Sequence, residues 1–262
     1  EACQSGKVAQ TKGFGEKTQE TIIQNLLFKA STSGKWLYAD IEETILALAA
    51  QLQQVLPKAQ VRVVGDFARR MEILTEGEFL IASEDLVATK ANLSQVEGVV
   101  WDKPISGPMT WRGKLADPEL QLVCHFCKEA ELVSKELLFV ASKAHLSSWI
   151  TEEETVGEKI QKSTLASEAD FFDQNNLQFI PREMREGMGE VELAKAGTLP
   201  TLLENSDLKG ILHNHSTYSD GKHTLRQMAE YCKGLGYDYL GISDHSRTAS
   251  YAGGLEIEKV AK

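Results

Sequence analysis

The sequence lacks the features that would assign it to a membrane, to a disulfide scaffold or to a strongly basic nucleic-acid binder. No apolar run approaches a membrane span, and no signal sequence is visible. Its four cysteines, Cys3, Cys124, Cys127 and Cys232, show no disulfide framework, so we expect a cytoplasmic protein. The net charge of -10 argues against a large basic surface that wraps nucleic acid but permits a local phosphate site.

The remaining composition is that of an ordinary soluble chain. The 262 residues suffice for one large domain or two to three small ones. No internal repeat or low-complexity tract is present. Because the first residue is Glu1 and the chain stops within a predicted domain, we expect an internal fragment. Residues 124–127 form a lone CxxC inside an apolar run, which favours a buried strand over a zinc site.

The most informative stretch is residues 210–221, where two histidines follow an apolar run. His213 and His215 are separated by one residue, so a strand would place both imidazoles on the same side. Asp220 follows in a Ser-Asp-Gly turn, and His245 comes just after a second apolar run. We expect all four side chains to meet at the carboxyl edge of a parallel sheet.

A helix is predicted between these two runs, over residues 224–234, with a threonine cap at its start and a glycine near its end. Strand, helix and strand then form a βαβ unit. Each histidine taken alone could be an ordinary hydrogen-bonded residue. Two such loops at the same end of consecutive strands favour a metal site, and a set of His and Asp suits Zn, Mn or Fe better than Ca or Mg.

These motifs resemble those of a known family. Residues 211–221 and 243–246 are similar to the first two metal-binding motifs of the PHP (polymerase and histidinol phosphatase) phosphoesterases. Residues 179–186, 199–200 and 207–210 resemble the linker of bacterial PolX, a family X, polymerase beta-like DNA polymerase fused to a C-terminal PHP domain.

The resemblance implies a metal-dependent phosphoesterase, acting as a 3′-5′ exonuclease in DNA repair. In it His213, His215, Asp220 and His245 would be partial ligands of metals that generate a hydroxide and stabilise phosphoryl oxygens. A PHP barrel needs over 200 residues by the arithmetic of closed barrels, and this chain supplies about two strands. We therefore expect the sequence as given to bind metal weakly and to have little activity.

A glycine-containing loop near the amino terminus precedes an amphipathic run over residues 19–27. Gly13 and Gly15 flank one apolar residue, which would let backbone N–H groups approach a phosphate at the start of a helix. An ordinary turn explains the pattern equally well. The PolX resemblance implies that this loop belongs to a helix-hairpin-helix. In that motif Gly13, Gly15 and Lys17 would bind the DNA backbone without base-specific contacts.

Apolar spacing predicts three further helices, over residues 41–56, 131–141 and 143–153. The first should bury one stripe: Ile41, Ile45, Leu46, Leu48, Ala49, Leu52 and Val55. The other two should form core with these residues: Leu132, Leu137, Leu138, Phe139, Trp149 and Ile150. Pro200 is expected to help end a later helix.

Residues 61–70 and 76–83 predict a strand, a tight turn and a second strand with two acids. This resembles the palm of the nucleotidyltransferase fold, whose Gly-Ser turn and arginines hold a triphosphate. Here the resemblance implies nucleotide contacts from Gly65, Arg69, Arg70 and Ser142. Paired carboxylates on one side of a strand, with a third from a neighbouring strand, would hold Mg or Mn for in-line displacement.

The palm pattern departs from the family at the positions that matter for catalysis. Asp66 replaces the serine of the turn and sets a negative charge where a triphosphate belongs. Glu76 and Glu78 replace the paired aspartates and are longer by one methylene, and the third acid is replaced by Val123. An ångström of misplacement can cost about 100-fold in rate. We expect a degenerate palm, or two solvated acids at the start of a strand.

The sequence thus predicts an α/β chain in five parts. These are a helix-hairpin-helix or fingers-like module (1–57), a nucleotidyltransferase-like palm (58–128), a thumb-like subdomain (129–178), a linker (179–205) and the start of a PHP (β/α) barrel (206–262).

Three functions follow from this organisation. The first is a DNA-binding PolX-type enzyme working through its PHP metal site. The second is a gap-filling DNA polymerase that uses deoxynucleoside triphosphates, against which the missing acids argue. The third is an inactive DNA-binding scaffold.

Overall fold

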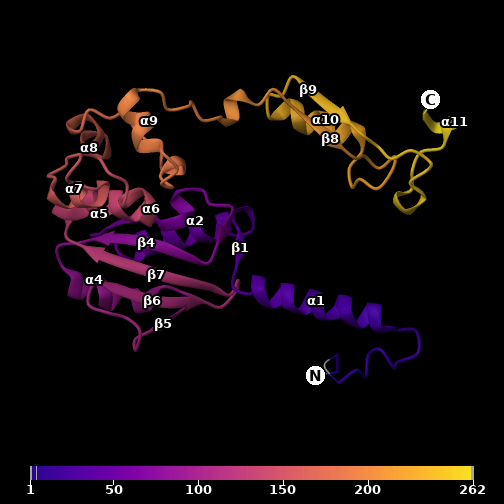
Figure 1. Cartoon of the computed structure of the whole chain (residues 1–262), viewed down its shortest axis with the longest axis horizontal. Helices are drawn as coiled ribbons and strands as arrows, with labels where there is room; N and C mark the ends of the chain where they lie inside the picture. The colour runs from indigo at the N-terminus through magenta and orange to yellow at the C-terminus, as the bar shows by residue number, and fades with distance from the viewer. Residues whose placement is uncertain (1, 4, 261–262) are drawn as a thin grey trace. The chain divides into compact units, whose positions relative to one another are not determined.

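The computed structural model describes residues 2–3 and 5–260 and has a mixed α/β architecture (Figure 1). It divides into two compact units, Glu1–Leu199 and Pro200–Lys262. None of the helices in the described part of the chain is long and apolar enough to cross a bilayer. The two units are described separately.

A five-stranded sheet forms the centre of the first unit, in the order β2-β4-β7-β6-β5. Only β4 and β7 pair in parallel; the other neighbours are antiparallel. The strands are β2 (Gln60–Val64), β4 (Glu76–Ala82), β5 (Val99–Asp102), β6 (Thr110–Leu115) and β7 (Leu120–Cys127). The CxxC of residues 124–127 is the buried end of β7, as the sequence predicts.

Helix α2 (Tyr38–Val55) covers one face of this sheet with the predicted apolar stripe. Ile41, Ile45, Leu48 and Leu52 are buried in one core cluster with residues of β4 and β7. Leu46 is the exception, since it is 51% exposed. It follows Ile45 by one residue, which turns it about 100° around the helix and away from the sheet.

Short elements complete the sheet region. A four-residue helix, α3 (Gly65–Ala68), stands where a tight turn was predicted after β2. Two short strands, β1 (Trp36–Leu37) and β3 (Ile73–Leu74), pair with each other, and α4 (Leu86–Asn92) continues into the 3-10 turn η1 (Leu93–Gln95). Asp85 caps α4 by accepting a hydrogen bond from the Ala88 N–H.

A second core lies among the helices that follow the sheet. Figure 1 shows α5 to α8 gathered beside one part of the sheet. The elements are η2 (Glu129–Glu131), α5 (Leu132–Phe139), α6 (Lys143–Leu146), α7 (Val156–Lys162) and α8 (Glu168–Gln174). Their core contains Leu137, Ile150, Val156, Phe171 and Phe172.

The predicted helix over residues 143–153 is wrong beyond Leu146. Ser147 and Ser148 turn their hydroxyls back onto carbonyls of their own last turn, an alternative that competes with helix extension. The chain then folds over, and Trp149 pairs with Thr155 in an isolated bridge. As a result Trp149 is 58% exposed, whereas its neighbour Ile150 is buried as predicted.

Residues 179–199, expected to be part of a linker, pack onto this second core. They carry the 3-10 turn η3 (Arg182–Met184) and helix α9 (Glu190–Ala196). Ile180, Val191 and Ala194 are buried in the same cluster as Phe171. Gly197, in the left-handed conformation, ends α9 before Pro200 is reached.

Helix α1 (Glu16–Thr32) extends the amphipathic run predicted over residues 19–27 in both directions. None of its 17 residues is buried. The described residues before it form turns, not the first helix of a helix-hairpin-helix.

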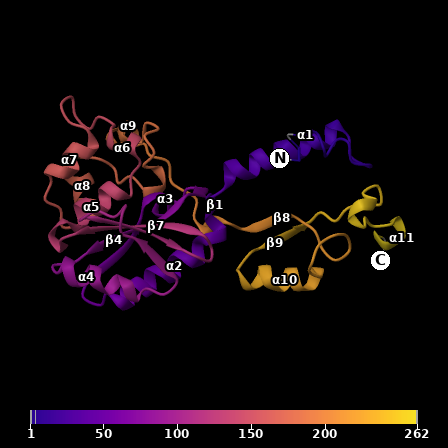
Figure 2. The same ribbon diagram turned by 90° about the horizontal axis from the view of Figure 1, so that it is seen from below.

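The second unit contains the predicted βαβ arrangement. Strands β8 (Gly210–Asn214) and β9 (Tyr239–Ile242) pair in parallel, and α10 (Leu225–Gly234) joins them (Figure 2). The Thr224 hydroxyl accepts from the Gln227 N–H and caps α10. The short turns η4 (Asn205–Asp207) and η5 (Ser250–Ala252) and helix α11 (Ile257–Val260) complete this unit.

Candidate metal centre and a carboxylate-bearing sheet face

Three predicted ligands converge beyond the carboxyl ends of β8 and β9. One donor atom from each of His215, Asp220 and His245 lies within 4.8 Å of the other two. The His215 Nδ1 is 2.8 Å from the Asp220 Oδ1, and the His245 Nε2 is 3.6 Å from the Asp220 Oδ2. Tetrahedral ligands at about 2.1 Å from zinc lie roughly 3.4 Å apart, so these spacings fit a small divalent cation.

The fourth predicted ligand, His213, lies outside this group. Its φ is +62°, and the β8–β9 register is irregular between Ile211 and Asn214. A residue with positive φ breaks the simple alternation of a strand, so the His-x-His spacing no longer fixes both imidazoles. The His213 and His215 rings are nearly parallel, with centroids 5.6 Å apart.

A partly buried hydrogen-bond cluster joins the chain neighbours of the three ligands, and the sequence did not predict it. Asp244 Oδ1 accepts from the Ser216 N–H at 2.7 Å and from the Ser219 hydroxyl at 2.6 Å. Its Oδ2 accepts from the Ser216 hydroxyl at 2.5 Å. Ser216 is 0% exposed.

The carboxylates of this region are held in their charged form. A hydrogen bond from His215 lowers the pKa of Asp220. For Asp244, partial burial acts to raise the pKa, but hydrogen bonds from Ser216 and Ser219 lower it below its usual value. An ionised carboxylate beside two imidazoles is a donor set that Zn, Mn and Fe accept.

The second acidic cluster lies on the sheet of the first unit, on the face opposite α2. Because paired residues in a sheet share a face, Glu78 on β4 lies beside Val123 on β7, which in turn lies beside Arg112 on β6. Glu78 Oε2 is 3.2 Å from the His125 Nε2, and Glu76 Oε2 is 3.8 Å from the Arg112 Nη1. Each acid therefore has a cationic or hydrogen-bonding partner from the chain itself.

The position on this face where a third acid was sought is occupied by a buried apolar residue. Val123 is 2% exposed and faces Glu78 where the family pattern would place an acid. Burial and then the neighbouring Glu78 charge raise the pKa of Glu76. The ring of His125 stacks on Phe139 with centroids 4.0 Å apart, which fixes the imidazole next to Glu78.

Comparison with known proteins gives one informative match. No protein-family model matches the sequence. The chain is 27% identical over 281 aligned positions to the DNA polymerase/3′-5′ exonuclease PolX of Bacillus subtilis (strain 168), an alignment that spans 99% of this chain. The chain is therefore similar to PolX along nearly its whole length, and it is called PolX-like in that sense. It spans 47% of the length of that relative.

A solved structure is also similar to the PolX-like chain. It is the crystal structure of Leishmania infantum polymerase beta, described as a ternary P/T complex. The match has 15% sequence identity and a TM-score of 0.47, and covers 68% of this chain and 96% of that one.

Three residues predicted to hold a nucleotide instead form ion pairs or hydrogen bonds with other residues of the PolX-like chain. Arg69 is 8% exposed, and its guanidinium contacts Asp66 and Glu186 at 2.5 Å each. The hydroxyl of Ser142 accepts from the His145 N–H and caps α6. Arg70 is an exposed residue 3.4 Å from Glu183.

Gly65 of the PolX-like chain lies close to one of the two acids. Its φ is +70°, and a Cβ added there would lie 2.0 Å from the Glu78 Oε1. The carboxylate of Glu78 thus occupies the space beside the turn where a triphosphate was predicted.

The predicted DNA contacts of the PolX-like chain lie together at the start of α1. Gly13, Gly15 and Lys17 are all exposed, and Gly15 is the N-cap of α1 without a side-chain cap. Gly13 has a φ of +93°, a conformation that glycine adopts readily. Their role in binding phosphate stays a prediction.

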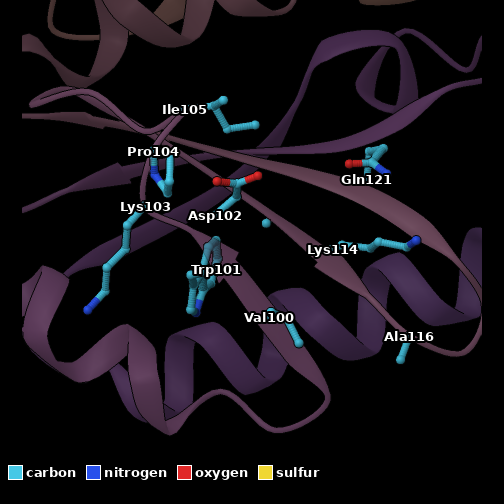
Figure 3. Close-up of a pocket in the computed structure, with 10 residues that line it drawn as sticks. Val100, Trp101, Asp102, Lys103, Pro104, Ile105, Lys114, Ala116 and Gln121 are labelled. Atoms are coloured by element: carbon cyan, nitrogen blue, oxygen red, sulfur yellow. The ribbon is translucent and has the colours of Figure 1, made fainter.

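A hollow of about 720 Å³ opens along β5 and β6 (Figure 3). Its lining includes Asp102, Lys103, Lys114 and Gln121, and none of the residues proposed above for catalysis. Gln121 is the β7 partner of Glu76, so the hollow borders the acidic part of the sheet. Its mixed charges select no single class of ligand.

Proposed function

We propose that this PolX-like chain processes DNA, that its phosphoester chemistry belongs to the centre formed by His215, Asp220 and His245, and that its nucleotidyltransferase-like sheet no longer catalyses. The convergence of three donor atoms carries this proposal. Among the described residues, no lysine or arginine forms an ion pair with Asp220. Its negative charge is therefore available to a cation.

A bound divalent metal would lower the pKa of a water and stabilise phosphoryl oxygens. His215 and His245 would offer ring nitrogens, and Asp220 a carboxylate oxygen. The hydrogen bond between Asp220 and His215 orients both groups before any cation arrives. The name of the Bacillus subtilis relative supports attack at the 3′ end of a DNA strand.

An exposed aromatic ring beside the centre supports a nucleic-acid substrate. Tyr251 is 88% exposed, and its ring centroid is 6.0 Å from that of His245. The hydrogen bond from the Leu255 N–H to the His245 carbonyl closes the loop that carries Tyr251. Aromatic rings of this kind stack with nucleobases of any sequence.

DNA binding would begin at a different place in the chain. Gly13, Gly15 and Lys17 at the start of α1 present backbone N–H groups and one ammonium to a phosphate. With a net charge of -10, we expect binding to be weak and strongly dependent on salt. A Gly13/Gly15 double substitution should weaken a gel shift with gapped duplex.

The gap-filling polymerase is disfavoured by the sheet face. Glu78 is paired with His125, and the third position is Val123. The inactive scaffold is the second candidate, and the position of His213 outside the convergent group favours it.

Two assays on the same preparation test the proposal. Nucleotide incorporation on gapped DNA with Mg²⁺ and Mn²⁺ should be absent. Robust extension that disappears in Glu76→Ala would contradict the proposal for the sheet. With Mn²⁺, slow shortening of a recessed 3′ end should disappear in Asp220→Ala and persist in Glu76→Ala. If the unaltered chain shortens no strand, the scaffold is favoured.

A further inference from the structure

The carboxylate of Asp244 joins the two loops that carry the candidate ligands. Asp244 follows β9, whereas Ser216 and Ser219 belong to the loop after β8. Three hydrogen bonds of 2.5 to 2.7 Å cross between the loops at this one side chain. Hydrogen bonds to a charged acceptor are about twice as strong as neutral ones.

Each residue of this cluster is the chain neighbour of one ligand. Ser216 follows His215, Ser219 precedes Asp220, and Asp244 precedes His245. The backbone of each ligand is thus fixed one peptide away from the cluster. Moving Asp244 relative to the serines would change the distances among all three donor atoms.

Asp244 is not itself one of the converging donors. Both of its oxygens already accept from serine groups, and its carboxylate lies outside the group of His215, Asp220 and His245. Its role must therefore be exerted through the other residues.

The pairing of the strands does not depend on Asp244. The Ser243 N–H donates to the Asn214 carbonyl at 2.7 Å, and the Asn214 side-chain amide donates to the Gly241 carbonyl at 3.2 Å. These bonds hold the ends of β8 and β9 together without any contribution from the carboxylate. Removal of Asp244 should release the ligand loops while leaving the βαβ unit folded.

We propose that Asp244 is a positioning residue, which sets the separation of the three candidate ligands by tying the loop of His215 and Asp220 to that of His245. The inference rests on the proposed function, since it requires that these three residues bind a cation. Residues behind the ligands of a metal site typically change its affinity by about 10- to 100-fold when they are substituted.

Cobalt binding to the 262-residue chain tests this inference. Co²⁺ titration followed by calorimetry gives the affinity, and the visible absorption of bound Co²⁺ reports the arrangement of its ligands. We expect Asp244→Ala to weaken Co²⁺ binding by about 10- to 100-fold and to change the visible spectrum at saturation. Asp244→Asn, which keeps one carbonyl acceptor, should restore part of the affinity.

Asp238→Asn is the matched control, because it removes one carboxylate charge from the same unit. Asp238 is exposed, and within the described chain its side chain has no hydrogen bond or ion pair. Its Co²⁺ affinity should stay within about twofold of the unaltered chain, as expected for a distant surface charge.

The outcomes separate this inference from the proposed function. The proposed function fails if the unaltered chain does not bind Co²⁺, or if His215→Ala binds Co²⁺ as tightly as the unaltered chain does. If it binds Co²⁺ and Asp244→Ala binds with the same affinity and spectrum, the inference is overturned and the proposed function stands.

Circular dichroism shows whether Asp244→Ala is folded. If it is not, Ser216→Ala and Ser219→Ala replace it, since each removes one hydroxyl hydrogen bond to Asp244 but keeps the charge. Graded losses of Co²⁺ affinity in these two variants support the positioning role. Affinities equal to that of the unaltered chain contradict it.

Discussion

The two acidic clusters of this chain differ in what surrounds their carboxylates. On the sheet, Glu78 contacts His125 and Glu76 lies near Arg112. In the second unit, Asp220 contacts two imidazoles and the Ser219 hydroxyl, and no lysine or arginine among the described residues forms an ion pair with it. A carboxylate beside a guanidinium, as Glu76 is, gains less from a bound cation than a carboxylate whose neighbours are imidazoles that can bind the same cation.

The comparison teaches that counting acids is not enough to assign a metal site. Two glutamates at alternate positions of a strand satisfy the spacing for metal binding. Their neighbours then decide whether a cation is still needed.

The largest effect is expected when a ligand of the second cluster is removed. Asp220→Ala should weaken Co²⁺ binding by about 100-fold or more, because a neutral methyl replaces the only carboxylate among the three donors. The double variant Glu76→Ala/Glu78→Ala should bind Co²⁺ as the unaltered chain does. If the double variant lost Co²⁺ affinity and Asp220→Ala did not, the metal site would lie on the sheet and not in the second unit.

The next effect concerns the surface beside the metal centre. Tyr251→Ala should weaken binding of a short single-stranded oligonucleotide by about 5- to 150-fold, since one stacked base contributes about 1–3 kcal/mol. Fluorescence anisotropy measures this, and Tyr251→Phe should bind normally. Tyr231→Ala is the control, because Tyr231 is an exposed tyrosine of α10 in the same unit. Equal losses in the two alanine variants would rule out a specific platform.

A smaller effect tests the balance of charge on the sheet. His125→Ala removes the partner of Glu78 and the ring stacked on Phe139. We expect it to lower the free energy of unfolding by about 1–3 kcal/mol, measured by urea titration. The same variant should bind Mn²⁺ more tightly at the sheet, because Glu78 has lost its partner. Gln121→Ala, an exposed change on the same strand, should do neither.

The smallest effect is a dependence of stability on pH from a buried pair outside both clusters. His145 Nδ1 is 2.5 Å from the Glu190 Oε1, and both side chains are almost fully buried. Burial lowers the pKa of His145 despite Glu190. For Glu190, burial acts to raise the pKa, but the hydrogen bond with His145 and those from the backbone lower it.

Both shifts act in the same direction. The unfolded chain binds more protons than the folded one, first at His145 below about pH 6.5 and then at Glu190 below about pH 4.3. Stability should therefore be complete near neutral pH and fall as the pH is lowered through these values. A His145→Gln variant should show a shallower loss of melting temperature between pH 7 and pH 5, because it removes the histidine that the unfolded chain protonates first. Parallel curves for both proteins would contradict this assignment.

Local patterns predicted much of the fold. The Thr224 cap and the apolar runs on either side of α10 gave the βαβ unit, because helix ends and strand periodicity are encoded within a few residues. The prediction for residues 143–153 failed because two serines offered their hydroxyls to the helix backbone.

The candidate sites were harder to predict because their contacts connect distant residues. His125 lies 47 residues from Glu78, and Asp244 lies 28 residues from Ser216. The sequence spacing of these two pairs does not predict that their side chains are in contact. The positive φ of His213 is likewise a property of the strand end, and the His-x-His pattern alone does not predict it.

The strand register around Val123 determines what an acid introduced there would contact. Val123 lies between Glu78 on one side and Arg112 on the other. The carboxylate of an aspartate introduced at this position would lie beside the Arg112 guanidinium and form an ion pair with it. It would also be buried at a site that is now apolar. A single substitution of Val123 would therefore bury a charge, which costs free energy, without creating a carboxylate that is free to bind a metal ion. An acid at position 123 could act on a cation without competition only if Arg112 changed as well.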